Sequence, residues 1–255
     1  MDTLPAIGLG TMGIDDPDVI ETALDVGYRH LDTAQIYRNE EAVGQGLRQS
    51  DIDREDVFVA TKLWGDSLLP DDVHRTADEC RDRLGLDVLD LLYVHRPVDT
   101  YRAEATLPAF DALYDKGTIA RVGVSNFTVS QLDTAIDVLD APLFAHQAEY
   151  HPLFQRPELR EHAREHDYHL VAYSPLAGGK ASEVPELRAV ANEHDTTPEA
   201  VCIAWLAGMD HVHPVPKSSS RTHLEANMAA LELELEESDV RRIESIEREE
   251  VLYPE

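Results

Sequence analysis

The sequence predicts one α/β domain, a (β/α)8 barrel that covers residues 1–255. Strand and helix signals alternate from one end of the chain to the other, as they do where parallel strands are joined by helices. A length of 255 residues is also usual for one such barrel. In addition, Asp32, Lys62 and His95 each end a short apolar run, and Tyr37 follows Asp32 by five residues. These side chains are therefore expected at the carboxyl ends of strands, where barrels of this kind carry their chemistry.

Proline and glycine mark the helices in the first half of the chain. Pro17 is expected to begin a helix that Gly27 ends, and Gly85 and Gly117 are expected to end two later ones. The apolar runs before these helices have the length of buried strands. The expected units are strand 6–9 with helix 17–26, strand 29–32 with helix 39–48, strand 57–62 with helix 71–84, and strand 89–95 with helix 103–116.

The second half continues the same alternation. Thr128 or Ser130 is expected to cap a helix, and Pro157, Pro185 and Pro198 are placed to begin three others. The expected units are strand 119–124 with the helix capped at 128 or 130, strand 144–149 with helix 157–166, strand 169–173 with helices 185–194 and 198–206, and strand 214–216 with helix 221–230. An extra C-terminal helix is expected over residues 238–248.

The chain is strongly acidic. Fifty acidic residues against twenty-two basic ones give a net charge of -28, and the acids are spread along the chain rather than gathered in a tail. Such a field repels phosphate, so nucleic acid is not an expected partner. Acids spread over a folded surface are tolerated where concentrated salt screens their repulsion. The composition therefore favours a protein of an extreme halophile, with an acidic surface.

Cysteine content and hydropathy indicate a cytoplasmic protein. Cys80 and Cys202 lie in separate helical patterns and are expected to be buried free thiols. No stretch is long and apolar enough to cross a membrane, and residues 1–5 show no signal-peptide pattern.

Asp32, Tyr37, Lys62 and His95 together suit the protonation of a carbonyl oxygen. A tyrosine has an ordinary pKa of about 10, and a lysine ammonium beside it lowers that pKa towards the working range. A carboxylate beside the lysine would keep the lysine charged and oriented. His95 would add a hydrogen-bond donor for the substrate oxygen. We therefore expect the acid half of a carbonyl reduction.

Such a reduction needs a hydride, which no side chain donates, so a nicotinamide or a flavin is implied. Gly8, Gly10 and Gly13 have the spacing of the G-x-G-x-x-G fingerprint of doubly wound folds, but Pro17 follows them, and we interpret the segment as a turn at the barrel rim. A dinucleotide would instead bind at the late strands, where barrels usually bind phosphate.

Several motifs together resemble those of the aldo-keto reductases over nearly the whole chain. The matching segments are Gly8-Leu9-Gly10-Thr11, Asp32-Thr33-Ala34-Gln35-Ile36-Tyr37 with Asn39-Glu40, Leu86-Asp87-Val88-Leu89-Asp90-Leu91 with His95-Arg96-Pro97, Gly123-Val124-Ser125-Asn126-Phe127, Gln147-Ala148-Glu149-Tyr150-His151-Pro152, Ala172-Tyr173-Ser174-Pro175-Leu176 and Pro216-Lys217-Ser218. The resemblance is to the 2,5-diketogluconate reductases and aldehyde reductases of that family.

This resemblance implies an NADPH-dependent reductase of aldehydes and ketones, monomeric and without a catalytic metal. It implies that Tyr37 is the general acid, that Lys62 and Asp32 tune it, and that His95 orients the carbonyl. For the cofactor it implies carboxamide contacts from Ser125, Asn126 and Gln147, ring stacking by Tyr173, a pyrophosphate loop with Ser174 and Leu176, and an adenosine end held by Lys217, Ser218 and Asn227.

Two departures from the family pattern affect specificity. His223 stands where the family usually has an arginine for the 2′-phosphate, and Arg221 is close enough in sequence to replace it, so NADH also remains possible. In the substrate wall, Met12 replaces an aromatic residue and Arg96 replaces a tryptophan, while Trp64 supplies an apolar surface. Arg96 either pairs with a rim acid such as Asp99 or attracts an anionic substrate. The long C-terminal loop of many relatives is mostly lacking, which predicts an open site.

Two other functions remain as alternatives. A barrel of this family could act as a redox sensor or regulatory subunit that binds cofactor with little turnover, although the intact proton-transfer residues argue against it. Metal-assisted hydrolysis lacks a coherent ligand set. His211 and His213 have ligand-like spacing, but they are expected away from the chemical end of the barrel.

Overall fold

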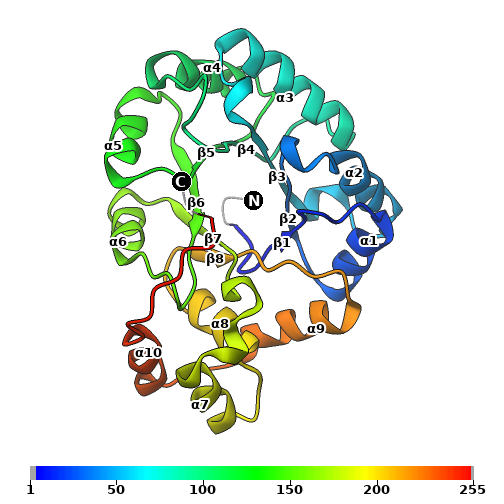
Figure 1. Cartoon of the computed structure of the whole chain (residues 1–255). Coiled ribbons are helices and arrows are strands. Elements are labelled where there is room, and N and C mark those ends of the chain that lie inside the picture. The colour runs from blue at the N-terminus through cyan, green and yellow to red at the C-terminus, as the bar shows by residue number, and fades with distance from the viewer. Residues whose placement is uncertain (1–3, 254–255) are drawn as a thin grey trace.

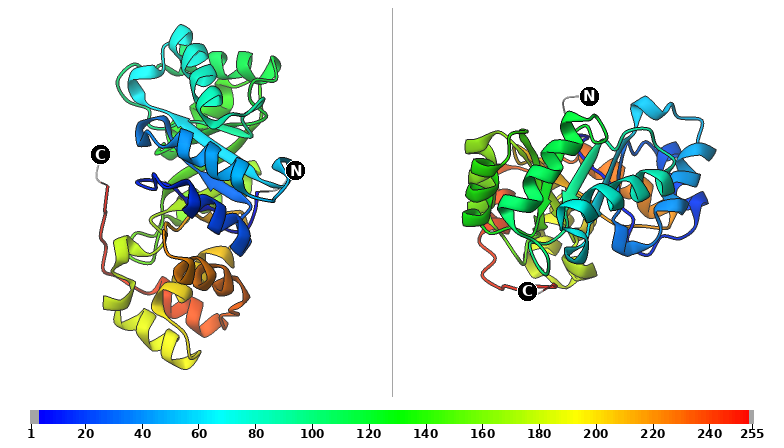
Figure 2. Two further views of the ribbon diagram at one scale, coloured as in Figure 1. Left: turned by 90° about the vertical axis from the view of Figure 1, so that its right-hand side faces the viewer. Right: turned by 90° about the horizontal axis from the view of Figure 1, so that it is seen from above.

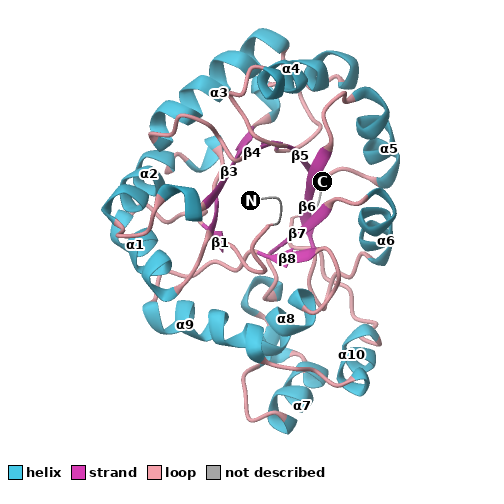
Figure 3. Ribbon diagram, turned by 180° about the vertical axis from the view of Figure 1, so that it is seen from behind, coloured by secondary structure: helices cyan, strands magenta, loops and turns pink. Residues whose placement is uncertain are grey.

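The computed structural model describes residues 4–253, which form a barrel of eight parallel strands inside a ring of helices (Figure 1; Figure 3). Each strand pairs in parallel with the next one along the chain. The predicted fold class is therefore confirmed. The strands are β1 (Leu9–Gly10), β2 (His30–Asp32), β3 (Phe58–Leu63), β4 (Leu91–Val94), β5 (Val122–Ser125), β6 (Leu143–Glu149), β7 (His169–Tyr173) and β8 (Val212–Pro214).

The helices begin and end close to the predicted residues. Gly27 and Gly85 follow two of them with φ values of 121° and 69°, which suit glycine. Thr128 is the N-cap in a capping box with Gln131. The helices are α1 (Pro17–Val26), α2 (Glu40–Gln49), α3 (Pro70–Leu84), α4 (Ala103–Asp115), α5 (Val129–Val138), α6 (Pro157–His166), α7 (Pro185–Glu193), α8 (Pro198–Ala207), α9 (Arg221–Ala229) and α10 (Glu237–Glu244).

The barrel closes between the first and last strands through hydrogen bonds that run in one direction. The backbone N–H groups of Gly8 and Gly10 donate to the carbonyl oxygens of Pro214 and Pro216, at 3.0 and 3.1 Å. The two prolines have no N–H to return, so the ladder here is incomplete. This explains why the predicted strands 6–9 and 214–216 are displaced, to Leu9–Gly10 and Val212–Pro214.

The prediction for the last helix was wrong at its end. α10 ends at Glu244, four residues before the predicted end, although the residues that follow are good helix formers. The chain instead leaves as an extended tail, drawn in red, that runs across one end of the barrel (Figure 2). Glu250 N–H donates to the carbonyl oxygen of Leu153 at 2.7 Å, so tertiary contacts outweigh local propensity.

Two apolar clusters support the barrel. The larger one fills the space between strands and helices. The smaller one fills the barrel interior and includes Phe58, Leu91, Tyr93, Val171 and Val215. Cys80 and Cys202 are buried free thiols, as predicted. Among the described residues no helix has the length and apolar character to cross a bilayer.

Candidate active site

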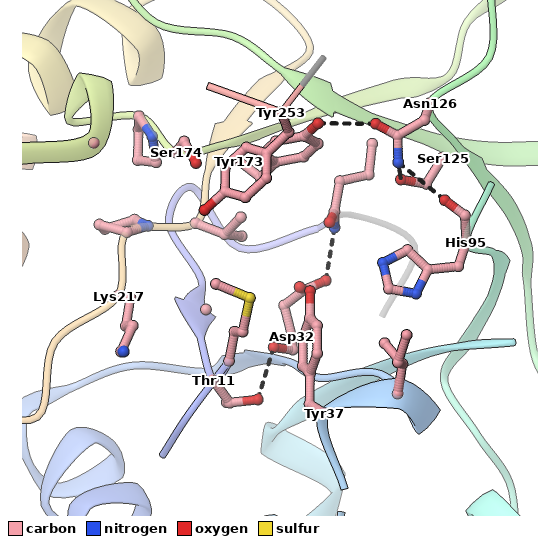
Figure 4. A pocket seen from close by; sticks show the side chains of 18 of the residues that line it. Thr11, Asp32, Tyr37, His95, Ser125, Asn126, Tyr173, Ser174, Lys217 and Tyr253 are labelled. Carbon is pink, nitrogen blue, oxygen red and sulfur yellow. Dashed lines mark hydrogen bonds between the residues drawn. The ribbon is translucent and has the colours of Figure 1, made fainter. Parts of the chain in front are cut away.

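A pocket of about 520 Å³ at the carboxyl ends of the strands brings together most of the predicted site residues (Figure 4). Its lining comes from the ends of several strands and the loops after them. Of the predicted residues it includes Asp32, Tyr37 and His95 for catalysis, Ser125, Asn126, Gln147, Tyr173, Ser174, Leu176 and Lys217 for cofactor, and Met12, Trp64 and Arg96 for substrate. Lys62 is fully buried outside this lining.

Lys62 and Asp32 form a buried ion pair between β3 and β2. Lys62 Nζ lies 2.6 Å from Asp32 Oδ1 and also donates to the carbonyl oxygen of Thr33 at 2.8 Å. The second oxygen of Asp32 accepts a hydrogen bond from Gln147 Nε2 at 2.7 Å. Both carboxylate oxygens are therefore bound, which fixes the direction in which the lysine points.

Tyr37 lies beside this pair, at the end of a short 3-10 helix, η1 (Gln35–Tyr37), after β2. Lys62 Nζ is 5.4 Å from the centroid of the Tyr37 ring. Burial raises the pKa of Tyr37 above its usual value, and Lys62 partly opposes that rise. The expectation of a net lowering was therefore wrong for this structure, because burial in a pocket of low polarity outweighs the nearby ammonium.

His95 faces the same end of the pocket and is held neutral. Burial, followed by the charges of Lys62 and Arg96, lowers the pKa of His95 to about 2. Its ring packs edge to face against Trp64 and Tyr37, with centroids 5.0 and 5.8 Å away. A neutral imidazole carries one N–H donor, so His95 can orient a carbonyl oxygen without adding a charge.

A hydrogen-bonded group of Ser125, Asn126 and Tyr173 lines the pocket beside His95. Tyr173 Oη donates to Asn126 Oδ1 at 2.9 Å, and Asn126 Nδ2 donates to Ser125 Oγ and to the His95 carbonyl oxygen, both at 3.0 Å (Figure 4). Asn126 also has a positive φ of 60°. Strained backbone of this kind is common at binding sites.

The far end of the pocket is lined by the loop after β7 and by Lys217. Gly178 and Gly179 have φ values of 65° and 85°, and a side chain at Gly179 would meet open space. Figure 4 shows Lys217 across the pocket from His95. The two ends of the pocket therefore differ: Lys217 supplies positive charge at one end, and Tyr37 and His95 lie at the other.

Four predicted cofactor residues lie outside the lining of this pocket. They are Ser218, Arg221, His223 and Asn227, of which three belong to α9. The guanidinium of Arg221 is 3.4 Å from Asp25 and 3.7 Å from Glu225, so acids already surround it. Asn227 is buried, and its amide nitrogen has no hydrogen-bond partner among the residues described.

The C-terminal tail contributes a residue that sequence reasoning did not select. Tyr253 lines the pocket, and its ring centroid is 5.8 Å from that of Tyr173. Glu149, at the end of β6, holds the tail because its carboxylate oxygens accept from the N–H groups of Leu252 and Tyr253, at 2.7 and 3.1 Å. The sequence signal for this contact was Glu149 itself, an acid at the end of a predicted strand, in the same motif as Gln147.

Arg96 lies at the wall of the pocket and lines a neighbouring recess of about 210 Å³ as well. Arg156 also lines that recess. Within the described part of the chain, Arg96 has no ion pair with Asp99 or any other acid. The pairing considered from the sequence is therefore not observed.

Two other histidines noted in the sequence make hydrogen bonds within the barrel, outside the lining of the pocket. His213 binds His169 at 2.9 Å and the Pro5 carbonyl oxygen at 3.0 Å, near the start of β7, which is the end away from the pocket. His146 accepts a hydrogen bond from the N–H of Phe127 at 3.2 Å.

Comparison with known proteins agrees with this geometry. The family model described as the aldo/keto reductase family matches residues 6–248. Methylglyoxal reductase DkgB of Escherichia coli O157:H7 is 34% identical over 250 residues, which is 96% of this chain and 93% of that protein. An aldo-keto reductase of Mycolicibacterium smegmatis is 35% identical over 257 residues, 99% and 93% of the two chains.

Solved structures show the same likeness. MGS-M4, an aldo-keto reductase enzyme from a Medee basin deep-sea metagenome library, superposes with a TM-score of 0.94 at 32% identity, over 99% of this chain and 95% of that one. The chain is thus similar to these proteins in sequence and in the arrangement of its barrel. The chain belongs to the aldo/keto reductase family.

Proposed function

We propose that this protein reduces aldehydes and ketones to alcohols with NADPH, and that Tyr37 supplies the proton. One observation carries the proposal. Tyr37 and His95 meet at one end of a pocket, beside the buried Lys62–Asp32 pair. The family's carbonyl-reducing members make reduction the expected direction of chemistry.

The pocket suits a dinucleotide. Tyr173 offers an aromatic face, and the group of Ser125, Asn126 and Gln147 offers amide and hydroxyl groups near it. The glycine turn at residues 178–179 leaves space for a phosphate chain, and Lys217 supplies positive charge beyond it. The role of Asn227 at the adenosine end stays a proposal, supported by its buried amide nitrogen, which has no hydrogen-bond partner among the described residues. When bound, the reduced nicotinamide would supply the hydride.

Each residue of the chain then has a distinct task in the proton half of the reaction. Neutral His95 donates a hydrogen bond to the substrate oxygen and aligns it with Tyr37. Tyr37 gives its proton to that oxygen as negative charge develops there. The Lys62 ammonium, fixed by Asp32, stabilises the phenolate that remains.

Gln147 and Asn126 would have to exchange partners to bind a carboxamide. In the structure Gln147 donates to Asp32, and the Asn126 amide is fully engaged. We propose that binding replaces the contact between Gln147 and Asp32. A Gln147→Glu variant should therefore weaken NADPH binding, since it removes the amide donor and places a second carboxylate beside Asp32.

Lys217 is the basis for preferring NADPH over NADH. No acid among the described residues forms an ion pair with it, whereas Arg221 is already near Asp25 and Glu225. We expect kcat/KM to be higher with NADPH than with NADH. Lys217→Met should lower kcat/KM with NADPH more than it lowers kcat/KM with NADH. A preference for NADH in the wild type would refute this choice.

Arg96 favours carbonyl substrates that carry a negative charge, such as keto acids. Its guanidinium lies at the substrate wall without an acidic partner within the described chain. Arg96→Leu should raise KM for a carboxylated carbonyl and leave KM for a neutral one of similar size nearly unchanged. If Arg96→Leu leaves the KM of the carboxylated carbonyl and the KM of the neutral carbonyl both unchanged, the anion hypothesis fails.

The class of function is tested by NADPH oxidation in the presence of methylglyoxal, followed at 340 nm in molar salt. An oxidoreductase gives multiple turnovers. A cofactor-binding sensor would bind NADPH, seen by quenching of protein fluorescence, and show no turnover with a panel of aldehydes.

A further inference from the structure

A cluster of metal-binding side chains lies on the outer ring, separate from the pocket. Asp133 on α5 and His162 and His166 on α6 place one ligand atom each within 4.8 Å of one another. Figure 1 shows α5 and α6 as neighbours on the outside of the barrel. The reductase chemistry proposed above uses none of these residues.

His162 is fixed in a direction that suits coordination. It is buried, with 6% of its surface exposed, and its Nδ1 lies 2.8 Å from the hydroxyl of buried Tyr168. The other ring nitrogen, Nε2, lies 3.1 Å from Asp133 Oδ1. Tyr168 thus binds Nδ1 of His162, and Nε2 faces the Asp133 carboxylate. Histidine ligands of metals are usually held in this way, with a hydrogen bond on the nitrogen that does not bind the metal.

His166 follows His162 by one helical turn, on the same face of α6. The two imidazole rings are stacked, with centroids 4.3 Å apart. His166 and Asp133 are exposed, so an ion and its waters can reach them. A hydrogen bond between His162 and Asp133 accounts for those two residues alone, and His166 has no hydrogen-bond partner within residues 4–253.

The surroundings favour a cation. His166 is the last residue of α6, where the helix dipole attracts positive charge. The net charge of -28 also raises the local concentration of cations at the surface. Ligands on a tetrahedral Zn²⁺ lie about 3.3 Å apart, which the nitrogen of His162 and the oxygen of Asp133 nearly match. A rotation of the exposed His166 side chain would complete the set.

We propose that Asp133, His162 and His166 form a binding site for a divalent transition metal of the Zn²⁺ class, with water in the remaining position. Two imidazoles and one carboxylate are the ligands that Zn²⁺ and Co²⁺ accept. The ion would link α5 to α6 and stabilise the fold without taking part in reduction.

The test is titration of metal-free protein with Co²⁺, read by its visible absorption bands, followed by displacement with Zn²⁺. We expect one saturable site per chain. His166→Ala should weaken Co²⁺ binding at least tenfold, and Asp133→Asn should weaken it several-fold. Both residues are exposed, so these variants should fold, which far-ultraviolet circular dichroism would check.

His74→Ala is the matched control. His74 is also a helical histidine with acidic neighbours, Asp71 and Asp78, but it has no second histidine one turn away. This variant should bind Co²⁺ like the wild type. Absence of saturable binding in the wild type, or equal binding in wild type and His166→Ala, would overturn the site. NADPH-dependent turnover is measured in parallel and should not change in any of the three variants.

Discussion

A lysine side chain with no exposed surface is unusual, and Lys62 is stable there because its charge is met by Asp32 and by the carbonyl oxygen of Thr33. Removing one partner of such a pair leaves an uncompensated charge in the interior. The pair therefore supports both the fold of the barrel mouth and the electrostatics around Tyr37.

Lys62→Met should accordingly lower the free energy of unfolding by about 3–5 kcal/mol and abolish reductase activity. Chemical denaturation measures the first effect. Lys116→Met is the control, because Lys116 is exposed at the end of α4 and its replacement should change stability by less than about 0.5 kcal/mol. Equal stability of Lys62→Met and the wild type would show that the pair contributes little.

The pKa directions predict a flat pH profile for reduction. Tyr37 must be protonated to act as an acid, and its pKa is raised, so activity should be lost only as pH rises above about 10. His95 must be neutral, and its pKa of about 2 keeps it so throughout the working range. We expect kcat/KM to stay constant from about pH 6 to about pH 9. A loss centred near pH 7, absent from the His95→Gln variant, would contradict the assignment of His95.

Most single residues of the site were predictable because each stands at the end of an apolar run or in a short motif. Asp32, Lys62 and His95 illustrate the first signal. The sign of the Tyr37 pKa shift was not predictable, since it depends on how deeply the phenol is buried. The contact between Gln147 and Asp32 joins residues 115 positions apart, and sequence spacing does not show it.

Among the structural elements, the C-terminal tail differs most from expectation. The residues after Glu244 favour helix, yet the tail is extended because Glu149 and Leu153 accept its backbone N–H groups. Local propensity gives no sign of such distant acceptors. Glycine and proline predicted the ends of other helices correctly, because their effect on the backbone is confined to one helical turn, as at Gly27 and Gly85.

Glu149→Gln should loosen this tail. The amide has one acceptor oxygen instead of two, so one of the N–H groups of Leu252 and Tyr253 loses its partner, at a cost of about 1–3 kcal/mol. Hydrogen exchange at these two amides should accelerate by at least about tenfold. Glu247→Gln, at an exposed position, should leave the exchange unchanged. Unchanged exchange in Glu149→Gln would mean that other contacts hold the tail.

At the scale of the whole molecule, the chain carries a large excess of acidic residues. If every one of the 22 basic residues paired with an acid, 28 of the 50 acids would still be unpaired. We propose that the surface is adapted to concentrated salt, as in proteins of extreme halophiles. The range of charge repulsion falls from about 10 Å at 0.1 M salt to about 3 Å at 1 M.

The melting temperature should therefore rise as KCl increases from about 0.1 M to about 1 M, where the screening length falls to about a third. Sucrose at matched osmolality is the control, since it adds no ions and should raise the melting temperature much less. A melting temperature that is independent of KCl, or full activity after long dialysis into dilute buffer, would refute adaptation to salt.

The role of the Tyr37 phenol is tested most directly by Tyr37→Phe, which removes one oxygen and keeps the ring. With NADPH and methylglyoxal, kcat should fall by about 100-fold to 10,000-fold, the usual contribution of a general acid. NADPH should still bind with an affinity close to that of the wild type, and the protein should be equally stable. A variant that keeps full activity would show that the proton comes from another group.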